Sequence, residues 1–159
     1  MADPVAPADG AYINKALWDA EVTGRWSDLY SPWAGYTPSW SAATTAPVLG
    51  NGTLTGAFIQ ISRTVHLRLR LVIGSSTNAG AGAWSFSLPT NHVLTAIQTI
   101  GGFVSNSAGS VRWPVSGYLS NAGGIERLGT LNNILGPAAP FSWASNDQLV
   151  LTGSYEITG

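Results

Sequence analysis

Apolar and polar residues alternate most regularly in the stretch VHLRLRLVI, residues 65–73. Every second position carries a large aliphatic side chain: Val65, Leu67, Leu69, Leu71 and Ile73. The positions between them are polar, among them Arg68 and Arg70, until Val72 ends the alternation. A period of two predicts a β-strand with one buried face, whereas a helix would scatter these residues around its axis. Burying each aliphatic side chain contributes about 1.5–3 kcal/mol, so the register of this strand is strongly fixed.

Further segments with strand character follow at short intervals, separated by residues that favour turns, such as SSTNAGAG, SNSAGS and NAGG. The predicted strands are Thr53–Ile61, Thr64–Ile73, Ala83–Leu88, Val93–Val104, Val111–Ser120, Ile125–Leu131, Phe141–Trp143 and Gln148–Ile157. About eight short strands joined by such turns predict an all-β fold, a β-sandwich or jelly roll of antiparallel strands. We assign this domain to residues 31–159.

The first 30 residues have a different pattern. Residues 1–10 are rich in Pro, Ala and Asp and read as a flexible leader. A helix is predicted over Ile13–Leu29, because apolar residues recur there at helical spacing. The candidate anchoring residues on this helix are Ile13, Leu17, Trp18, Val22, Trp26 and Leu29. A helix of this length is marginal by itself in water, so its apolar stripe must dock on its own domain, on a sister chain or on a partner.

Aromatic residues are the strongest sign of recognition in the sequence. The chain has seven tryptophans, and prolines exclude a helix from the segment between Ser31 and Pro47. Tryptophan and tyrosine rings stack on sugars and are enriched at protein interfaces. The candidate ligand or subunit contacts are Trp33, Tyr36, Trp40 and Trp113. The alternative for these four is core packing, which we expect for Trp84, Phe86, Phe141 and Trp143.

Charged residues make up only 9% of the chain, and the formal net charge is −1. Five of the eight acidic residues precede residue 30, and none lies between Leu29 and Ile125. A near-neutral chain offers no electrostatic case for binding nucleic acid or an anionic membrane. The sequence has no cysteine, no apolar run near the ~20 residues of a membrane span, and no signal-peptide pattern at its start. A domain this poor in charge is suited to hiding surface in an assembly.

The sequence offers few residues that could form a catalytic site. Two histidines, His66 and His92, stand without clustered acids, so we expect neither a metal site nor a cofactor. A glycosidase would need paired carboxylates from Glu126, Asp147 and Glu156. We expect instead that Glu126 or Glu156 pairs across strands with Arg68 or Arg70. No catalytic residue is assigned, and the chain is predicted not to be an enzyme.

Several motifs together resemble a known family. They are the segments GYTPSW, LGNGTLTG, RTVHLRLRLVIGSSTNAGAGAWSFSLP and APFSWASNDQLVLTGSYEI. From about Trp33 to its end the chain resembles the C-terminal domain family of tailed-phage minor tail and tail-fibre proteins, especially those of phages that infect actinobacteria. The segment from Asn14 to Val22 is similar to one that often precedes such domains.

The resemblance implies a non-enzymatic, homotrimeric β-sandwich on the virion exterior. From the apolar helical stripe we add the hypothesis that the N-terminal segment attaches the chain to the particle, and from the missing signal-peptide pattern we expect synthesis in the host cytoplasm. Its partners would be sister chains, other virion proteins of the tail or capsid, and a host cell-surface glycan. Such domains commonly end a longer fibre, whereas only some thirty residues precede this one. That departure favours a short tail spike, minor tail or receptor-binding module, with a capsid decoration protein as the alternative. A free-standing carbohydrate-binding module is a further alternative.

Overall fold

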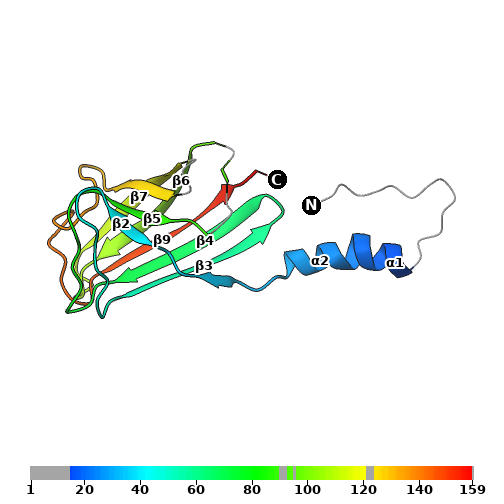
Figure 1. The fold of residues 1–159 in the computed structure, drawn as a ribbon, viewed down its shortest axis with the longest axis horizontal. Helices are drawn as coiled ribbons and strands as arrows, with labels where there is room; N and C mark the ends of the chain where they lie inside the picture. Colours follow the sequence, from blue (N-terminus) through cyan, green and yellow to red (C-terminus); the bar gives the residue numbers. More distant parts are fainter. Residues whose placement is uncertain (1–14, 90–92, 95, 121–123, 159) are drawn as a thin grey trace.

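The structure is a computed structural model and describes residues 15–89, 93–94, 96–120 and 124–158. Its strands are β1 (Ala34–Tyr36), β2 (Trp40–Ala42), β3 (Thr53–Ile61), β4 (Thr64–Val72), β5 (Trp84–Ser87), β6 (Gln98–Ser105), β7 (Arg112–Ser120), β8 (Gly124–Gly129) and β9 (Gln148–Glu156). Three helical elements precede them: α1 (Lys15–Trp18), the π-helical turn η1 (Asp19–Thr23) and α2 (Gly24–Leu29). Figure 1 shows the helices extending away from one end of the sheet.

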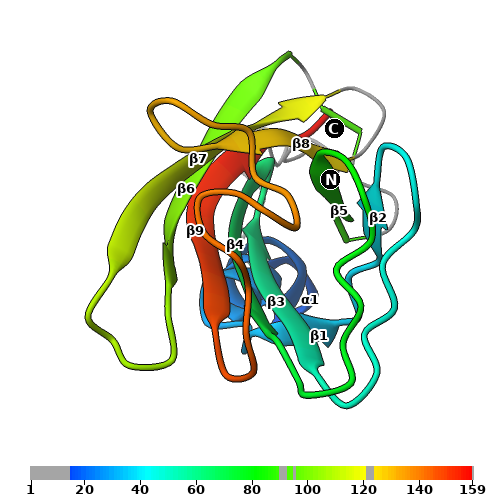
Figure 2. The ribbon, with the colours of Figure 1, turned by 90° about the vertical axis from the view of Figure 1, so that its left-hand side faces the viewer.

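The nine strands form one antiparallel sheet in the order β1-β3-β4-β9-β6-β7-β8-β5-β2. The end-on view in Figure 2 shows this sheet curled around its own interior. The all-β, antiparallel prediction is confirmed. The sandwich or jelly roll is not, because the ladder of described strands is continuous and is not divided into two separate sheets.

The two edges of the curled sheet are joined by the chain itself. Strand β1 pairs with β3 at one edge, and β2 pairs with β5 at the other. Only residues 37–39 separate β1 from β2. At this seam the backbone N–H of Ser87 donates to the carbonyl of Ser39 (3.0 Å), and the N–H of Ser39 donates to Ser87 Oγ (2.9 Å). The segment 34–42 therefore holds the curled sheet closed.

Strand β4 lies in the interior of the sheet, between β3 and β9. All five aliphatic side chains of its predicted buried face are at most 4% exposed. With inward residues of β5 to β9 they form one hydrophobic core. The predicted strand Thr53–Ile61 is confirmed at both ends, and β4 ends one residue before its predicted end. The alternation therefore identified the central strand and its buried face correctly.

Other boundaries differ from the predictions. The predicted strand Val93–Val104 begins only at Gln98. Residues 141–143 are not a strand, although the rings of Phe141 and Trp143 pack half-buried against the core, 5.0 Å apart between centroids. Trp84 and Phe86 are buried, as predicted. The short strands β1 and β2 were not predicted, because each has three residues in a proline-rich segment.

Candidate functional site

The two tryptophans of the helical stripe are about half exposed. Trp18 and Trp26 are 52% and 54% exposed, and Val22 is half-buried. Trp26 stacks on Tyr30 with ring centroids 6.0 Å apart. Ile13 and the side chains of Leu17 and Leu29 lie outside what the structure describes. No described helical residue belongs to the hydrophobic core, so an anchoring role for this stripe stays a prediction.

Tyr36 and Trp40 lie at the seam where the curled sheet closes. The Tyr36 ring meets Phe58 edge-on (6.1 Å), and its hydroxyl donates to the carbonyl of Ser87 (3.4 Å). Burial raises the pKa of Tyr36 above its usual range. The pKa of Tyr155 is raised too, first by burial and then by its electrostatic coupling to the nearby Tyr36 hydroxyl, because two phenolates so close would repel each other. The Tyr36 hydroxyl is therefore held neutral inside the fold.

Trp40 packs into the aromatic part of the core. Its ring meets Trp84 edge-on at 4.9 Å and lies parallel to Phe86 at 6.2 Å. Its buried indole nitrogen has no hydrogen-bond partner among the described residues. Tyr36 and Trp40 thus fit the core-packing alternative better than an open contact with a ligand.

Trp33 and Trp113 are exposed, at 43% and 44%. Trp33 immediately precedes β1 at one edge of the sheet, whereas Trp113 lies on β7. In the sheet, β3, β4, β9 and β6 stand between those two strands. The four aromatic candidates therefore do not form one site, and their roles in ligand or subunit contact stay predictions.

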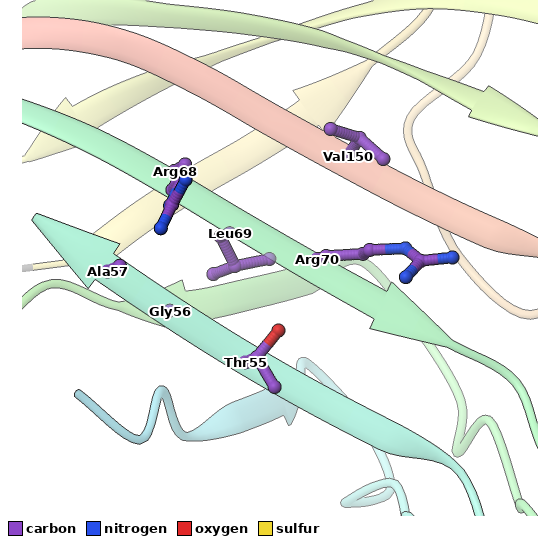
Figure 3. Close-up of a pocket in the computed structure, with 7 residues that line it drawn as sticks. All are labelled: Thr55, Gly56, Ala57, Arg68, Leu69, Arg70 and Val150. Carbon is purple, nitrogen blue, oxygen red and sulfur yellow. The ribbon is translucent and has the colours of Figure 1, made fainter. Parts of the chain in front are cut away.

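The exposed face of β3, β4 and β9 carries a groove of about 440 Å³ that passes beside Arg68 and Arg70. The register of the three strands explains the hollow. Arg68 stands between Ala57 and Thr152, and Arg70 between Thr55 and Val150. Figure 3 shows the two long side chains pointing away from each other, with shorter residues between and beside them.

Each guanidinium has a local support. The Cζ atom of Arg68 lies 4.7 Å from the centroid of the Trp33 ring, within the range of a cation–π contact. Arg70 donates from Nε (3.1 Å) and Nη2 (3.0 Å) to Oε1 of Gln148. Both partners are uncharged, so each arginine is oriented without being neutralised.

The predicted ion pairs of these arginines with Glu126 or Glu156 are wrong. Among the described side chains, neither guanidinium forms a salt bridge with a carboxylate. Glu156 stands opposite Thr64, four residues from Arg68 along β4, and Glu126 accepts a hydrogen bond from Ser120 Oγ (2.8 Å) on β7. Arg68 and Arg70 were therefore missed as site residues. The sequence did contain a sign of unpaired arginines, because no acidic residue lies between residues 30 and 125.

Asp147 and Glu156, two of the three carboxylates of the sheet domain, are not arranged as an acid–base pair. Asp147 is 2% exposed and accepts hydrogen bonds from the backbone N–H groups of Ser107 (2.7 Å) and Ala144 (2.6 Å). Glu156 lies at the far end of β9, about 30 Å away for nine extended residues. Glycosidase carboxylates lie within about 10 Å of each other. The Asp147 carboxylate thus holds together the two loops that contain Ser107 and Ala144.

His66 lies on the outer face of β4, and its Nδ1 lies 2.7 Å from Ser154 Oγ. His92 lies outside the described residues. Within the described part of the chain, no three His, Asp or Glu residues gather where they could hold a metal ion. None of the described helices has the length and hydropathy to cross a membrane.

Comparison with known proteins gives one informative match. The chain is 30% identical over 127 residues to the Mu-like prophage FluMu defective tail fiber protein of Haemophilus influenzae. The matched region is 78% of this chain and 20% of that protein, so the chain spans about a fifth of the length of this relative. No family model and no solved structure matches the chain. The match supports relationship to a phage tail-fibre family, in agreement with the resemblance seen in the sequence.

Proposed function

We propose that the chain is a non-enzymatic structural module on the exterior of a tailed-phage virion, working as a homotrimer in a tail spike, minor tail or receptor-binding assembly. Its N-terminal segment attaches it to the particle. Its curled sheet faces outward, where it contacts other virion proteins or the host cell surface.

The observation that carries this proposal is the similarity to a tail fiber protein over 78% of the chain. The distribution of exposed side chains adds support. Trp18 and Trp26 are about half exposed on helices that extend beyond the sheet, where a partner could cover them. The sheet domain has a complete core of its own and so needs no cover from these helices.

The experiment is a count of copies per particle. Virions of the encoding phage are purified, and the chain is quantified by mass spectrometry against the major capsid protein, in parallel with tailless heads. A tail module predicts a handful of copies per virion and none in the heads. Hundreds of copies that persist in tailless heads would assign the chain to capsid decoration. Absence from particles would refute the virion role altogether.

A further inference from the structure

We infer that the groove beside Arg68 and Arg70, hereafter the arginine groove, binds an acidic polysaccharide. The exposed β3–β4–β9 face that carries it holds two unneutralised guanidinium groups with supported orientations. The inference deepens the proposed function, because it names the class of surface polymer that an exterior module would contact.

The charge of the groove follows from the sheet register. Along β4, Arg68 and Arg70 are two residues apart, so both project from the same face. The exposed acid on the adjacent strand β9 is Glu156, which lies four residues beyond Thr152, the partner of Arg68. That separation is about 13 Å along an extended strand, beyond the reach of a direct ion pair. An anionic group that enters the groove therefore meets positive charge without a competing carboxylate on these strands.

The shape of the groove favours an extended ligand with more than one anionic group. The two arginine side chains point away from each other (Figure 3). The guanidinium of Arg68 lies over the Trp33 ring, and that of Arg70 is hydrogen-bonded to Gln148. Beside them on β3 the surface is formed by the short side chains of Thr55 and Ala57. A single phosphate-sized ion could touch one arginine, whereas a short polymer could place a carboxylate or sulfate at each.

The neighbouring side chains favour a saccharide over an acidic peptide. Thr55, Thr152 and Gln148 offer uncharged donors and acceptors that suit sugar hydroxyls. Trp33 is 43% exposed while it supports Arg68, so part of its ring is available to the apolar face of a sugar. An extended peptide gains affinity mainly by joining the edge of a sheet, but this groove lies on a face, where backbone groups are already paired.

The test measures binding of the full chain to defined oligosaccharides by isothermal titration calorimetry. The probes are tetragalacturonate, a heparin tetrasaccharide, neutral maltotetraose and a tetraglutamate peptide. We expect binding to at least one acidic oligosaccharide, no binding to maltotetraose, and an affinity that falls as NaCl is raised. In the double variant Arg68→Gln/Arg70→Gln, affinity should fall about tenfold or more, because charge-assisted hydrogen bonds to both groups are lost.

The matched control is Arg63→Gln/Arg127→Gln, which removes the same charge from two exposed arginines outside the groove. This control should keep its affinity within about twofold, since long-range charge effects are screened. Both double variants should stay folded, with thermal unfolding midpoints no more than a few degrees below that of the wild type, because all four side chains are exposed and the control loses only the hydrogen bond from Arg63 Nε to the carbonyl of Ile157 (3.3 Å). Equal losses in the two double variants would overturn the inference, as would binding to tetraglutamate alone, equal binding to maltotetraose, or no binding to either acidic sugar. The result is independent of the copy number in particles, so failure of this inference and failure of the virion role are distinguishable.

Discussion

Gly101 and Gly102 are neighbours in β6, but they face opposite sides of the sheet. Gly102 lies on the inner face between Val115 of β7 and Leu151 of β9. A Cβ atom there would lie 1.9 Å from the carbonyl oxygen of Val150, a backbone atom that cannot turn aside. At Gly101 the nearest atom would be 3.8 Å away, an ordinary contact. The close approach of β6 and β9 thus depends on one glycine and not on its neighbour.

We therefore expect Gly102→Ala to lower the free energy of unfolding by about 1–3 kcal/mol, the usual cost of overpacking. Gly101→Ala should leave it unchanged or raise it slightly, since the unfolded chain loses freedom. Urea unfolding followed by tryptophan fluorescence at a fixed protein concentration measures both. Equal stability of the two variants would mean that β6 and β9 are not packed as the structure has them.

For Arg68 and Arg70, the sequence predicted the face of the sheet from which the side chains project but not the residues that they contact. The alternation around Leu69 placed Arg68 and Arg70 on the outer face, where they are found. Their expected partner Glu156 is displaced because β9 pairs with β4 in a register that brings Thr64 opposite it. Arg68 and its partner Thr152 are 84 residues apart in the sequence. The register between two such distant strands is set by the tertiary fold and cannot be read from the alternation within one strand. The support of Arg68 by Trp33 is non-local for the same reason.

At the scale of elements, long strands with one buried face were predictable and short closing strands were not. β3 and β4 are nine residues each, enough for alternation to distinguish strand from helix. β1 and β2 are three residues each, and their pairing with distant strands makes them strands. Because they close the sheet, missing them also left the curled, continuous sheet unpredicted. The helical elements α1, η1 and α2 contribute no described residue to the core that these strands enclose.

Deletion of residues 1–30 tests the separate role of the helical elements. We expect the shortened chain to keep the urea midpoint of the full chain within the error of the measurement, because the core residues lie in the sheet domain. In complementation of a phage that lacks the gene, the shortened chain should be absent from purified particles, since the exposed Trp18 and Trp26 are lost. The full-length chain supplied in the same way is the control. Incorporation of the shortened chain would contradict attachment through this segment.

At the scale of the whole molecule, apolar side chains remain exposed on a surface with few charges. Leu131 is 95% exposed, Ile97 70% and Ile134 54%. Leu131 also borders a shallow hollow next to Pro114 on the outer side of β7. Single exposed apolar residues are ordinary on protein surfaces. Here they occur in a chain with 9% charged residues, a combination that suits burial between subunits.

The homotrimer that the family resemblance implies would bury such a surface, and it is the state we expect in solution. Sedimentation equilibrium should give about 50 kDa, three times the chain mass of 16.6 kDa, because identical subunits close into cyclic assemblies. Leu131→Glu serves as the probe of the interface. A side chain so exposed contributes almost nothing to the fold of one chain, so the variant should keep its secondary structure by circular dichroism. If Leu131 is buried between subunits, the new charge must be desolvated there, and the variant should dissociate at protein concentrations where the wild type stays trimeric. A wild type that sediments as a single chain across the micromolar range would refute the trimer, and a trimeric Leu131→Glu variant would place the interface on another face.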